Sequence, residues 1–192
     1  MTVRIPFFYH LPEIDTPRMT LRQFERRDAR KIVELTNGRS NHFHKDKWRQ
    51  LTYLSEQYIA HMLRCYKIGQ PAPWAMVDKQ TSYVIGVCGY VDWDRDLARA
   101  EIGFELDPSF WRKGWMTEAL QAIIPYGFQH CQLQELYAKC LEVNIPSKKL
   151  LKKVGMVRIE RQKSYLWKEQ RYEWVEYYRM SRKEYEERRA GL

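Results

Sequence analysis

The stretch that decides the fold is Trp111-Arg112-Lys113-Gly114-Trp115-Met116-Thr117-Glu118-Ala119. It follows residues 98–106, which have the pattern of a strand, and it precedes four apolar residues at helical spacing: Leu120, Ile123, Ile124 and Phe128. We therefore expect a strand, a short basic loop with one glycine, and a helix. The first N–H groups of a helix have no intrahelical partners and lie at the positive end of its dipole, so this junction suits a phosphate group. Many strand–loop–helix junctions share this form, and the surrounding chain has to support the assignment.

The bulk composition is that of a soluble globular protein. The chain has 192 residues, 44% of them apolar and 30% charged, which fits one domain with a sizeable core. No apolar run reaches transmembrane length, and residues 1–17 lack the features of a signal peptide, so we expect a cytoplasmic location. The four cysteines are far apart and form no CxxC motif, which favours buried reduced thiols: Cys65, Cys88, Cys131 and Cys140.

The net charge of +9 indicates a solvated basic surface, with an anionic partner such as RNA, the ribosome or a polyphosphate cofactor as the alternative. No signature of an RNA-binding module is present, so we do not expect nucleic acid as a partner. The positive balance also weighs against a free polycationic substrate such as a polyamine. His42 and His44 form an HxH pair without acidic or cysteine partners, and we expect no metal site.

The order of elements predicts an α/β (mixed α+β) fold in one domain over residues 1–192. An irregular arm over 1–17 leads into the other elements, which are an edge strand at 19–24, a helix from Asp28 to Asn37, a helix at 55–68, a strand hairpin of 73–77 and 83–91, a strand at 98–106, a helix at 117–129, a strand at 136–141, a helix at 145–154, strands at 156–167 and 172–180, and a helix over 181–192 that opens on the capping box Ser181–Glu184. The sheet is expected to have seven strands, mostly antiparallel, with a parallel crossover through 117–129 and helices on its flanks.

Four pieces of the chain, in this order, resemble one family. They are Pro17-Arg18-Met19-Thr20-Leu21-Arg22, Ala100-Glu101-Ile102-Gly103-Phe104, the stretch 111–119, and Asn144-Ile145-Pro146-Ser147 continued by Leu150 and Lys153-Val154-Gly155-Met156. Together they resemble the GNAT superfamily of acyl-CoA N-acyltransferases, from about Thr16 to Tyr185. Within that superfamily they look most like the branch that contains the Rim-type ribosomal-protein N-terminal acetyltransferases. The resemblance implies a sheet splayed between its fourth and fifth strands, acetyl-CoA as co-substrate, no metal, and a homodimer.

Some positions depart from the family pattern. Trp111 and Met116 stand at the first and last positions of the family's loop, where Gln or Arg and Gly or Ala are usual. The Met116 side chain is therefore expected to point away from the cofactor. Leu151 stands where many members have a tyrosine that serves as general acid, and the Rim-type branch suggests Ser147 in its place.

The resemblance assigns cofactor binding to three segments: the loop, the strand before it and the start of the helix at 145–154. The N–H groups of the loop would hold the pyrophosphate, and pantetheine would lie along the exposed edge of residues 102–106 in the manner of an added strand. A backbone N–H near Phe104 would bind the thioester carbonyl. The predicted cofactor-binding residues are Phe104, Glu105, Leu106, Arg112, Lys113, Gly114, Trp115, Met116, Thr117, Asn144 and Ser147. For the side chains of Arg112 and Lys113, the equal alternative is that they are solvated charges of the loop with no role in binding. Asn144 is also expected to cap the helix that follows it.

Two residues are candidates for catalysis by direct transfer in a ternary complex. Glu101 is the candidate base for the acceptor amine, and the alternative is a surface residue paired with an arginine such as Arg99. Ser147 is the candidate acid for the leaving thiolate, and the alternative is a simple hydroxyl at a helix N-terminus. Direct transfer requires no covalent intermediate, so Cys140 is not expected to act as a nucleophile.

The acceptor pocket is expected to form from residues 39–74 and the turn between the last two strands. Its candidate acidic residues are Asp46, Glu56, Glu169 and Glu173, and its candidate aromatic residues, for most of which a place in the core or at its rim is the alternative, are His42, Phe43, His44, Trp48, Tyr53, Trp74, Tyr165, Trp167 and Trp174. The sequence favours an N-acetyltransferase acting on a primary amine, with a protein N-terminus as one possibility. The alternatives are a non-catalytic acyl-CoA-binding or RNA- or ribosome-associated module and, more weakly, a small-molecule (antibiotic or polyamine) acetyltransferase.

Overall fold

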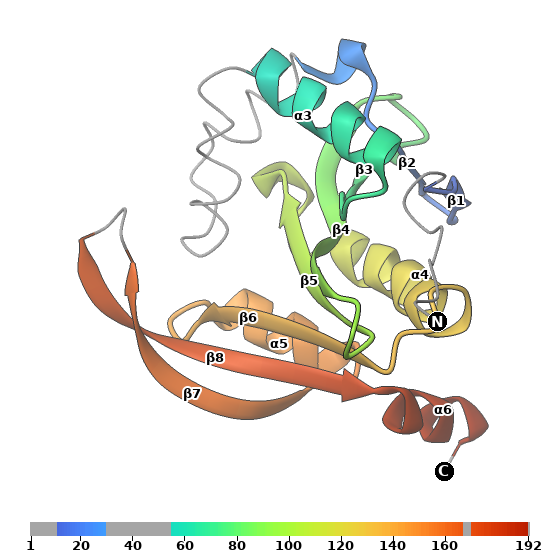
Figure 1. The fold of residues 1–192 in the computed structure, drawn as a ribbon. Coiled ribbons are helices and arrows are strands. Elements are labelled where there is room, and N and C mark those ends of the chain that lie inside the picture. The colour runs from blue at the N-terminus through green and yellow to red at the C-terminus, as the bar shows by residue number, and fades with distance from the viewer. Residues whose placement is uncertain (1–10, 30–54, 167–169, 192) are drawn as a thin grey trace.

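The computed structural model describes residues 11–29, 55–166 and 170–191 (Figure 1). The elements, in chain order, are β1 (Ile14–Asp15), β2 (Met19–Arg22), the 3-10 turn η1 (Arg26–Asp28), α3 (Ser55–Ile68), β3 (Trp74–Asp78), β4 (Val84–Asp94), β5 (Arg99–Leu106), the 3-10 turn η2 (Pro108–Phe110), α4 (Trp115–Gln129), β6 (Glu135–Leu141), α5 (Ile145–Lys153), β7 (Val157–Leu166), β8 (Arg171–Ser181) and α6 (Arg182–Ala190). Apart from the helix predicted from Asp28 to Asn37, which lies largely outside the described residues, every predicted helix and strand is present.

The strands form one mixed sheet in the order β1-β2-β3-β4-β5-β6-β8-β7. All neighbouring strands are antiparallel except β5 and β6, which are parallel. The mostly antiparallel sheet with one parallel crossover through α4 is therefore confirmed.

The strand count was predicted wrongly by one. Ile14 and Asp15 belong to the stretch expected to be irregular, yet they pair with Leu21 and Thr20 as strand β1. Consequently β2 is not the edge strand. A strand of two residues is too short to show the alternation of apolar and polar residues by which strands are recognised.

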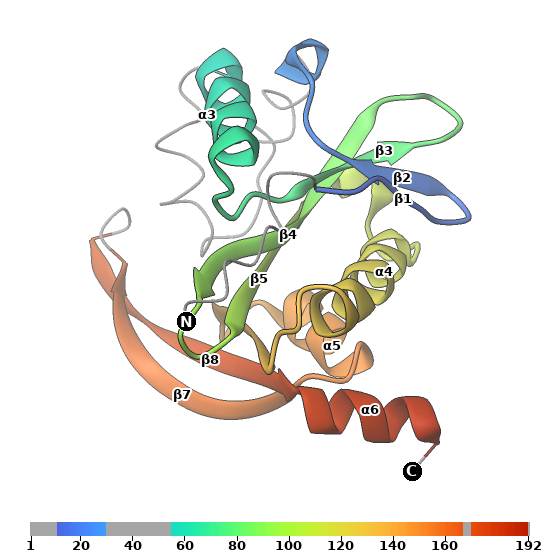
Figure 2. The same cartoon turned by 45° about the vertical axis from the view of Figure 1, so that its right-hand side comes forward.

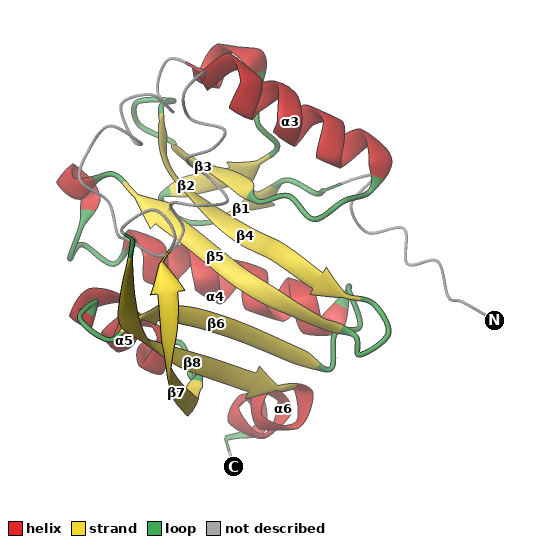
Figure 3. Cartoon of the chain, turned by 60° about the vertical axis from the view of Figure 1, so that its left-hand side comes forward, coloured by secondary structure: helices red, strands yellow, loops and turns green. Residues whose placement is uncertain are grey.

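The helices cover both faces of the sheet. Helices α4 and α5 lie on one face and α3 on the other (Figures 2 and 3). The core on the α4 side is closely packed, because α4 buries an apolar stripe against the sheet: Ala119, Leu120, Ile123 and Phe128 are all 0% exposed. Within the described ranges no helix is long and apolar enough to cross a membrane.

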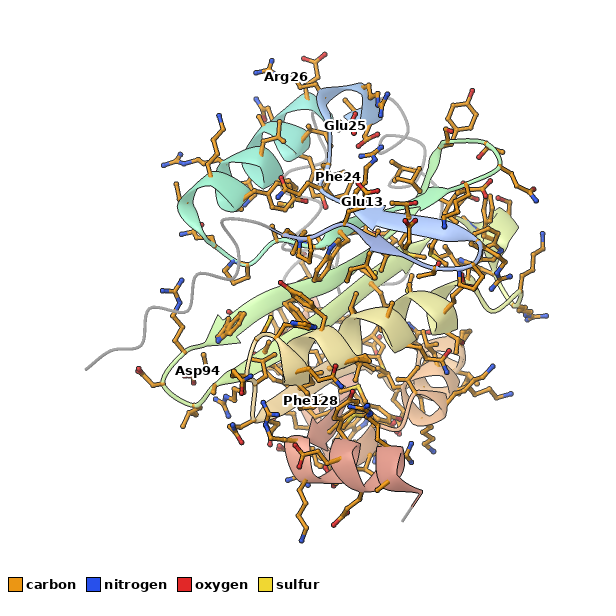
Figure 4. All side chains as sticks on the ribbon, turned by 90° about the vertical axis from the view of Figure 1, so that its right-hand side faces the viewer. Glu13, Phe24, Glu25, Arg26, Asp94 and Phe128 are labelled. Atoms are coloured by element: carbon orange, nitrogen blue, oxygen red, sulfur yellow. The ribbon has the colours of Figure 1, made fainter. Side chains whose placement is uncertain are left out.

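The last helix packs against α4 through aromatic side chains. The rings of Phe128 on α4 and Tyr185 on α6 stack with centroids 4.8 Å apart, and Figure 4 shows Phe128 next to α6. Gln129 Nε2 also donates a hydrogen bond of 3.0 Å to the Tyr185 hydroxyl. At the start of α6, Ser181 and Glu184 form the predicted capping box. All four cysteines are free and buried, as expected.

A buried carboxylate on β8 binds side chains of both α5 and β7. Glu176 on β8 is 1% exposed and accepts hydrogen bonds from Tyr178 Oη (2.7 Å), Lys148 Nζ (2.9 Å) and Arg158 Nη1 (3.1 Å). Burial by itself raises the pKa of Glu176, but the hydrogen bonds from Tyr178, Lys148 and Arg158 outweigh it and lower the pKa to about 2. Lys148 Nζ also donates to the Glu142 carbonyl, so this cluster holds the turn between β6 and α5.

We expect Glu176→Gln to destabilise the protein in a pH-dependent way. The folded-state pKa lies below the ordinary 4.5, so the ionised carboxylate stabilises the fold above about pH 4.5 and this contribution disappears as the pH falls toward 2. The shift corresponds to at most about 3 kcal/mol. Urea unfolding at pH 7 and at pH 3 should show a gap between wild type and variant that narrows in acid. A gap independent of pH would contradict this account.

Candidate active site

Strands β5 and β6 separate after a short paired segment. Their parallel pairing covers only Arg99 with Glu135, Ala100 with Leu136, and Glu101 with Tyr137. Beyond it, residues 102–106 stay paired with β4 and residues 138–141 with β8, and within the described chain they do not pair with each other. The predicted splay is therefore present, and it leaves backbone N–H and C=O groups along the two facing edges. Extending the register places Phe104 level with Cys140 across the gap.

The loop that follows β5 has an unusual backbone. Arg112 has φ +58° and Gly114 has φ +81°, so two of its residues adopt the left-handed region. Two side chains of the loop donate hydrogen bonds to nearby backbone carbonyls. Trp111 Nε1 donates to the Leu106 carbonyl (2.7 Å), and Lys113 Nζ donates to the Ser109 carbonyl (2.8 Å). The Lys113 ammonium therefore has a partner within the loop, while the side chain of Arg112 is exposed.

The loop ends at a helix N-terminus suited to an anion. Gly114 is the N-cap of α4, and the first intrahelical bond that follows it runs from Glu118 N to the Gly114 carbonyl (3.0 Å). The N–H groups of Trp115, Met116 and Thr117 therefore have no intrahelical acceptors. Met116 is buried in the core, so its side chain points away from the loop surface. These donors, with no side chain on Gly114, fit a pyrophosphate group.

The opposite side of the gap is the turn between β6 and α5. Asn144 is the N-cap of α5, and its Oδ1 accepts a hydrogen bond of 3.2 Å from Ser147 N. The capping role expected for Asn144 is confirmed, and its amide NH₂ is the group that remains suited to a ligand. Both Asn144 and Ser147 are buried. Leu151, one turn further, is 1% exposed and belongs to the core.

Glu101 is buried and paired with a lysine. Its side chain is 5% exposed, and Oε2 lies 2.9 Å from Lys139 Nζ. The alternative of a surface residue paired with Arg99 is wrong, because Arg99 contacts Asp94 (3.4 Å) and lies over the Tyr137 ring (5.9 Å). Lys139 was not predicted as the partner of Glu101. The signal was available, since Tyr137 and Lys139 alternate with Leu136 and Ala138 and so share one face of β6.

The candidate catalytic residues approach the gap from different faces. Glu101 alternates with Ala100 and Ile102 along β5, so its side chain lies on the opposite face of the sheet from theirs. Ser147 lies on α5, on the α4 side. Glu105 shares the face of Glu101 and lies near Tyr58 of α3, whose pKa is raised by burial and further by the charges of Tyr66 and Glu105. Phe104 and Leu106 pack against the core.

Much of the expected acceptor pocket lies outside the described residues, namely His42, Phe43, His44, Asp46, Trp48, Tyr53, Trp167 and Glu169. Of the others, Trp74 is 0% exposed and is a core residue. Tyr165 packs edge-on against Tyr172, and Glu173 forms an ion pair with Arg171. The guanidinium carbon of Arg161 lies 3.9 Å from the centroid of the Trp174 ring. Glu56 is exposed on α3. Among the described residues no group of three or more His, Cys, Asp or Glu side chains is arranged to hold a metal ion.

Known proteins share this sequence pattern and fold. The family model described as acetyltransferase (GNAT) domain matches residues 18–157. An uncharacterised N-acetyltransferase, p20 of Bacillus licheniformis, is 32% identical over 153 residues, which cover 74% of this chain and 84% of that protein.

Two solved structures share the fold at lower sequence identity. The ribosomal α-N-protein acetyltransferase RimL in complex with coenzyme A has a TM-score of 0.72 at 18% identity, covering 88% of this chain and 98% of that chain. A spermidine N-acetyltransferase SpeG chimera from Vibrio cholerae and hSSAT has a TM-score of 0.74, also at 18% identity, with the same coverage of 88% and 98%.

Proposed function

Because the chain belongs to the GNAT family of acetyltransferases, we propose that it moves the acetyl group of acetyl-CoA to a primary amine, and that the acceptor is a protein N-terminal amine. The observation that carries the proposal is the gap between β5 and β6, which opens after three paired residues beside the exposed N-terminus of α4. It would give a peptide-like ligand a strand edge at one end and an anion site at the other.

Backbone groups of the loop and of β5, together with the Asn144 amide, would bind the cofactor. The N–H groups of the loop from Arg112 to Thr117 would hold the pyrophosphate, and the edge of β5 that faces β6, from Phe104 to Leu106, would pair with pantetheine. The Asn144 amide would donate from the opposite side. Acetyl-CoA supplies an activated thioester, and the N–H near Phe104 would stabilise the negative charge that develops on its carbonyl oxygen.

The proton transfers are assigned to two side chains. The Glu101 carboxylate takes the proton of the acceptor amine, directly or through a water molecule, as the new C–N bond forms. The Ser147 hydroxyl donates a proton to the sulfur as the C–S bond breaks. Glu101 and Ser147 lie on opposite faces of the sheet, which supports an acceptor that approaches from the α3 face while the cofactor enters from the α4 face. Because acetyl-CoA and the amine would be bound at the same time, the acetyl group can pass directly between them without a covalent enzyme intermediate.

Two features favour a protein N-terminus over a polyamine. The net charge of +9 disfavours a free polycation, and the Rim-type resemblance points to peptide acceptors. We further propose that the enzyme is cytoplasmic, that its chain forms a single domain, and that it is a homodimer, as that resemblance implies.

The rival function is a non-catalytic acyl-CoA-binding module. It is favoured by Leu151, which cannot donate a proton at the position where many family members have a tyrosine acid.

Two measurements test the proposal. Calorimetry should detect acetyl-CoA binding, and a thiol-release assay should then show turnover with N-terminal peptides above that with spermidine or aminoglycosides. No binding at millimolar acetyl-CoA would contradict the donor assignment. Binding without thiol release from any acceptor would favour the rival module.

A further inference from the structure

Arg18 connects the start of the sheet to the loop before α4. It lies in the turn between β1 and β2, and its guanidinium makes three contacts with the region around that loop. Nε donates to Glu118 Oε2 (2.7 Å) and Nη1 donates to the Lys113 carbonyl (2.9 Å). The guanidinium carbon also lies 4.5 Å from the centroid of the Trp115 ring. One side chain therefore contacts the loop, the first residue of α4 and the first turns of that helix.

Glu118 holds this arginine in place. Its carboxylate also accepts hydrogen bonds from Arg18 N (3.0 Å) and Thr16 Oγ1 (2.7 Å), about 100 residues away in the chain. The side chain is 17% exposed. Burial raises the pKa of Glu118, but the hydrogen bonds from Thr16 and Arg18 outweigh it and keep the pKa below its ordinary range. The pair is thus an ion pair with several additional hydrogen bonds, which are stronger than neutral ones.

The loop has a backbone that needs such support. Arg112 adopts a left-handed conformation that is unfavourable for a side chain of its kind, and such residues persist only where their surroundings hold them. Lys113 stands between Arg112 and Gly114, both left-handed. Its carbonyl is the loop atom that Arg18 binds.

The geometry of the Lys113–Gly114 peptide links the hydrogen bond from Arg18 to the proposed anion site. The Lys113 carbonyl and the Gly114 N–H belong to one planar trans peptide, in which the two groups point in opposite directions. Because Arg18 holds the carbonyl on its own side, the Gly114 N–H points away from Arg18. That N–H is among the donors assigned above to the pyrophosphate.

We propose that Arg18, held by Glu118, is a positioning residue that fixes the Lys113–Gly114 peptide with its N–H toward the pyrophosphate of acetyl-CoA, and so sets cofactor affinity. The inference rests on the proposed function. It assigns no direct contact with substrate to either residue.

The test compares Arg18→Ala, Arg18→Lys and Glu118→Gln with wild type. Calorimetry with CoA should show a Kd raised about tenfold or more in each variant, since a charge-assisted contact is lost. In the thiol-release assay KM for acetyl-CoA should rise while kcat at saturation stays within about twofold. Arg18→Lys should not restore affinity, because an ammonium cannot bind the carboxylate and the carbonyl in the same forked geometry.

Two controls separate positioning from general stability. Asp15→Asn weakens the ion pair between Asp15 Oδ1, on β1, and Lys79 Nζ, just after β3 (3.0 Å), and it should leave the CoA Kd unchanged. S-acetyl-pantetheine lacks the pyrophosphate, so its KM should not change in the Arg18 variants.

The outcomes are distinct. Wild-type CoA affinity in folded Arg18→Ala and Glu118→Gln overturns the inference, and so does an equal loss of affinity in Asp15→Asn. If Arg18→Ala does not fold, Arg18→Lys and Glu118→Gln decide the question in the same assay. Failure of the wild-type protein to bind CoA would instead overturn the proposed function.

Discussion

Replacement of Gly114 by glutamate is expected to abolish acetyl-CoA binding, with Kd raised by about 100-fold or more. Gly114 is the N-cap of α4 with φ +81° and ψ 0°, a conformation that costs an L-residue roughly 1–2 kcal/mol. The larger effect is electrostatic. A carboxylate at this position would lie beside the free N–H groups of the helix N-terminus, compete with the pyrophosphate for them, and repel it.

The C-cap of α6 offers a matched control. Gly191 caps α6 with φ +76°, and a Cβ there would meet nothing within 4 Å. Gly191→Glu therefore imposes the same backbone strain and the same charge away from the proposed site, and calorimetry should find its affinity for acetyl-CoA unchanged. Gly114→Ala should fall between the two, because its Cβ would contact only Arg18 Nη2 at 3.5 Å. Wild-type affinity in folded Gly114→Glu would remove this loop from the cofactor site.

The sequence predicts best those features that neighbouring residues determine. The cap of α5 by Asn144 and the capping box of Ser181 with Glu184 are both present as expected, because each depends on residues three positions apart. The apolar stripe of α4 also followed from local pattern, and the gap after β5 followed from the resemblance.

The remaining features depend on contacts between distant parts of the chain. A glutamate in the first turn of a helix is ordinary, so nothing near Glu118 indicates that its partners are Thr16 and Arg18. In the same way, Glu101 stood out as a carboxylate in an apolar run, but its partner Lys139 is set by the short parallel pairing of β5 with β6. Strand β1 was missed because two residues carry no periodic signal.

Replacement of Glu101 by glutamine is expected to lower kcat by about 10²–10⁴-fold, the usual contribution of a general base, while the Kd for acetyl-CoA stays unchanged. Glutamine keeps the size of the side chain and an oxygen that can accept the hydrogen bond from Lys139, but it cannot take a proton from the amine. Pre-steady-state thiol release at saturating acetyl-CoA and acceptor would measure the acetyl-transfer step. Circular dichroism would confirm that the variant is folded.

The competing explanation for a loss of activity is that Glu101 serves only to hold β5 and β6 together through Lys139, at 2.9 Å. Lys139→Met separates the two roles. It removes the ion pair and leaves the carboxylate in place, so it should lower the stability of the protein, because a buried carboxylate loses an oppositely charged neighbour. If Glu101 is the base, folded Lys139→Met retains far more acetyl transfer than Glu101→Gln, although Glu101→Gln is the more stable protein. Equal losses of kcat in the two variants would mean that the ion pair, and not proton transfer, is what the reaction requires of Glu101.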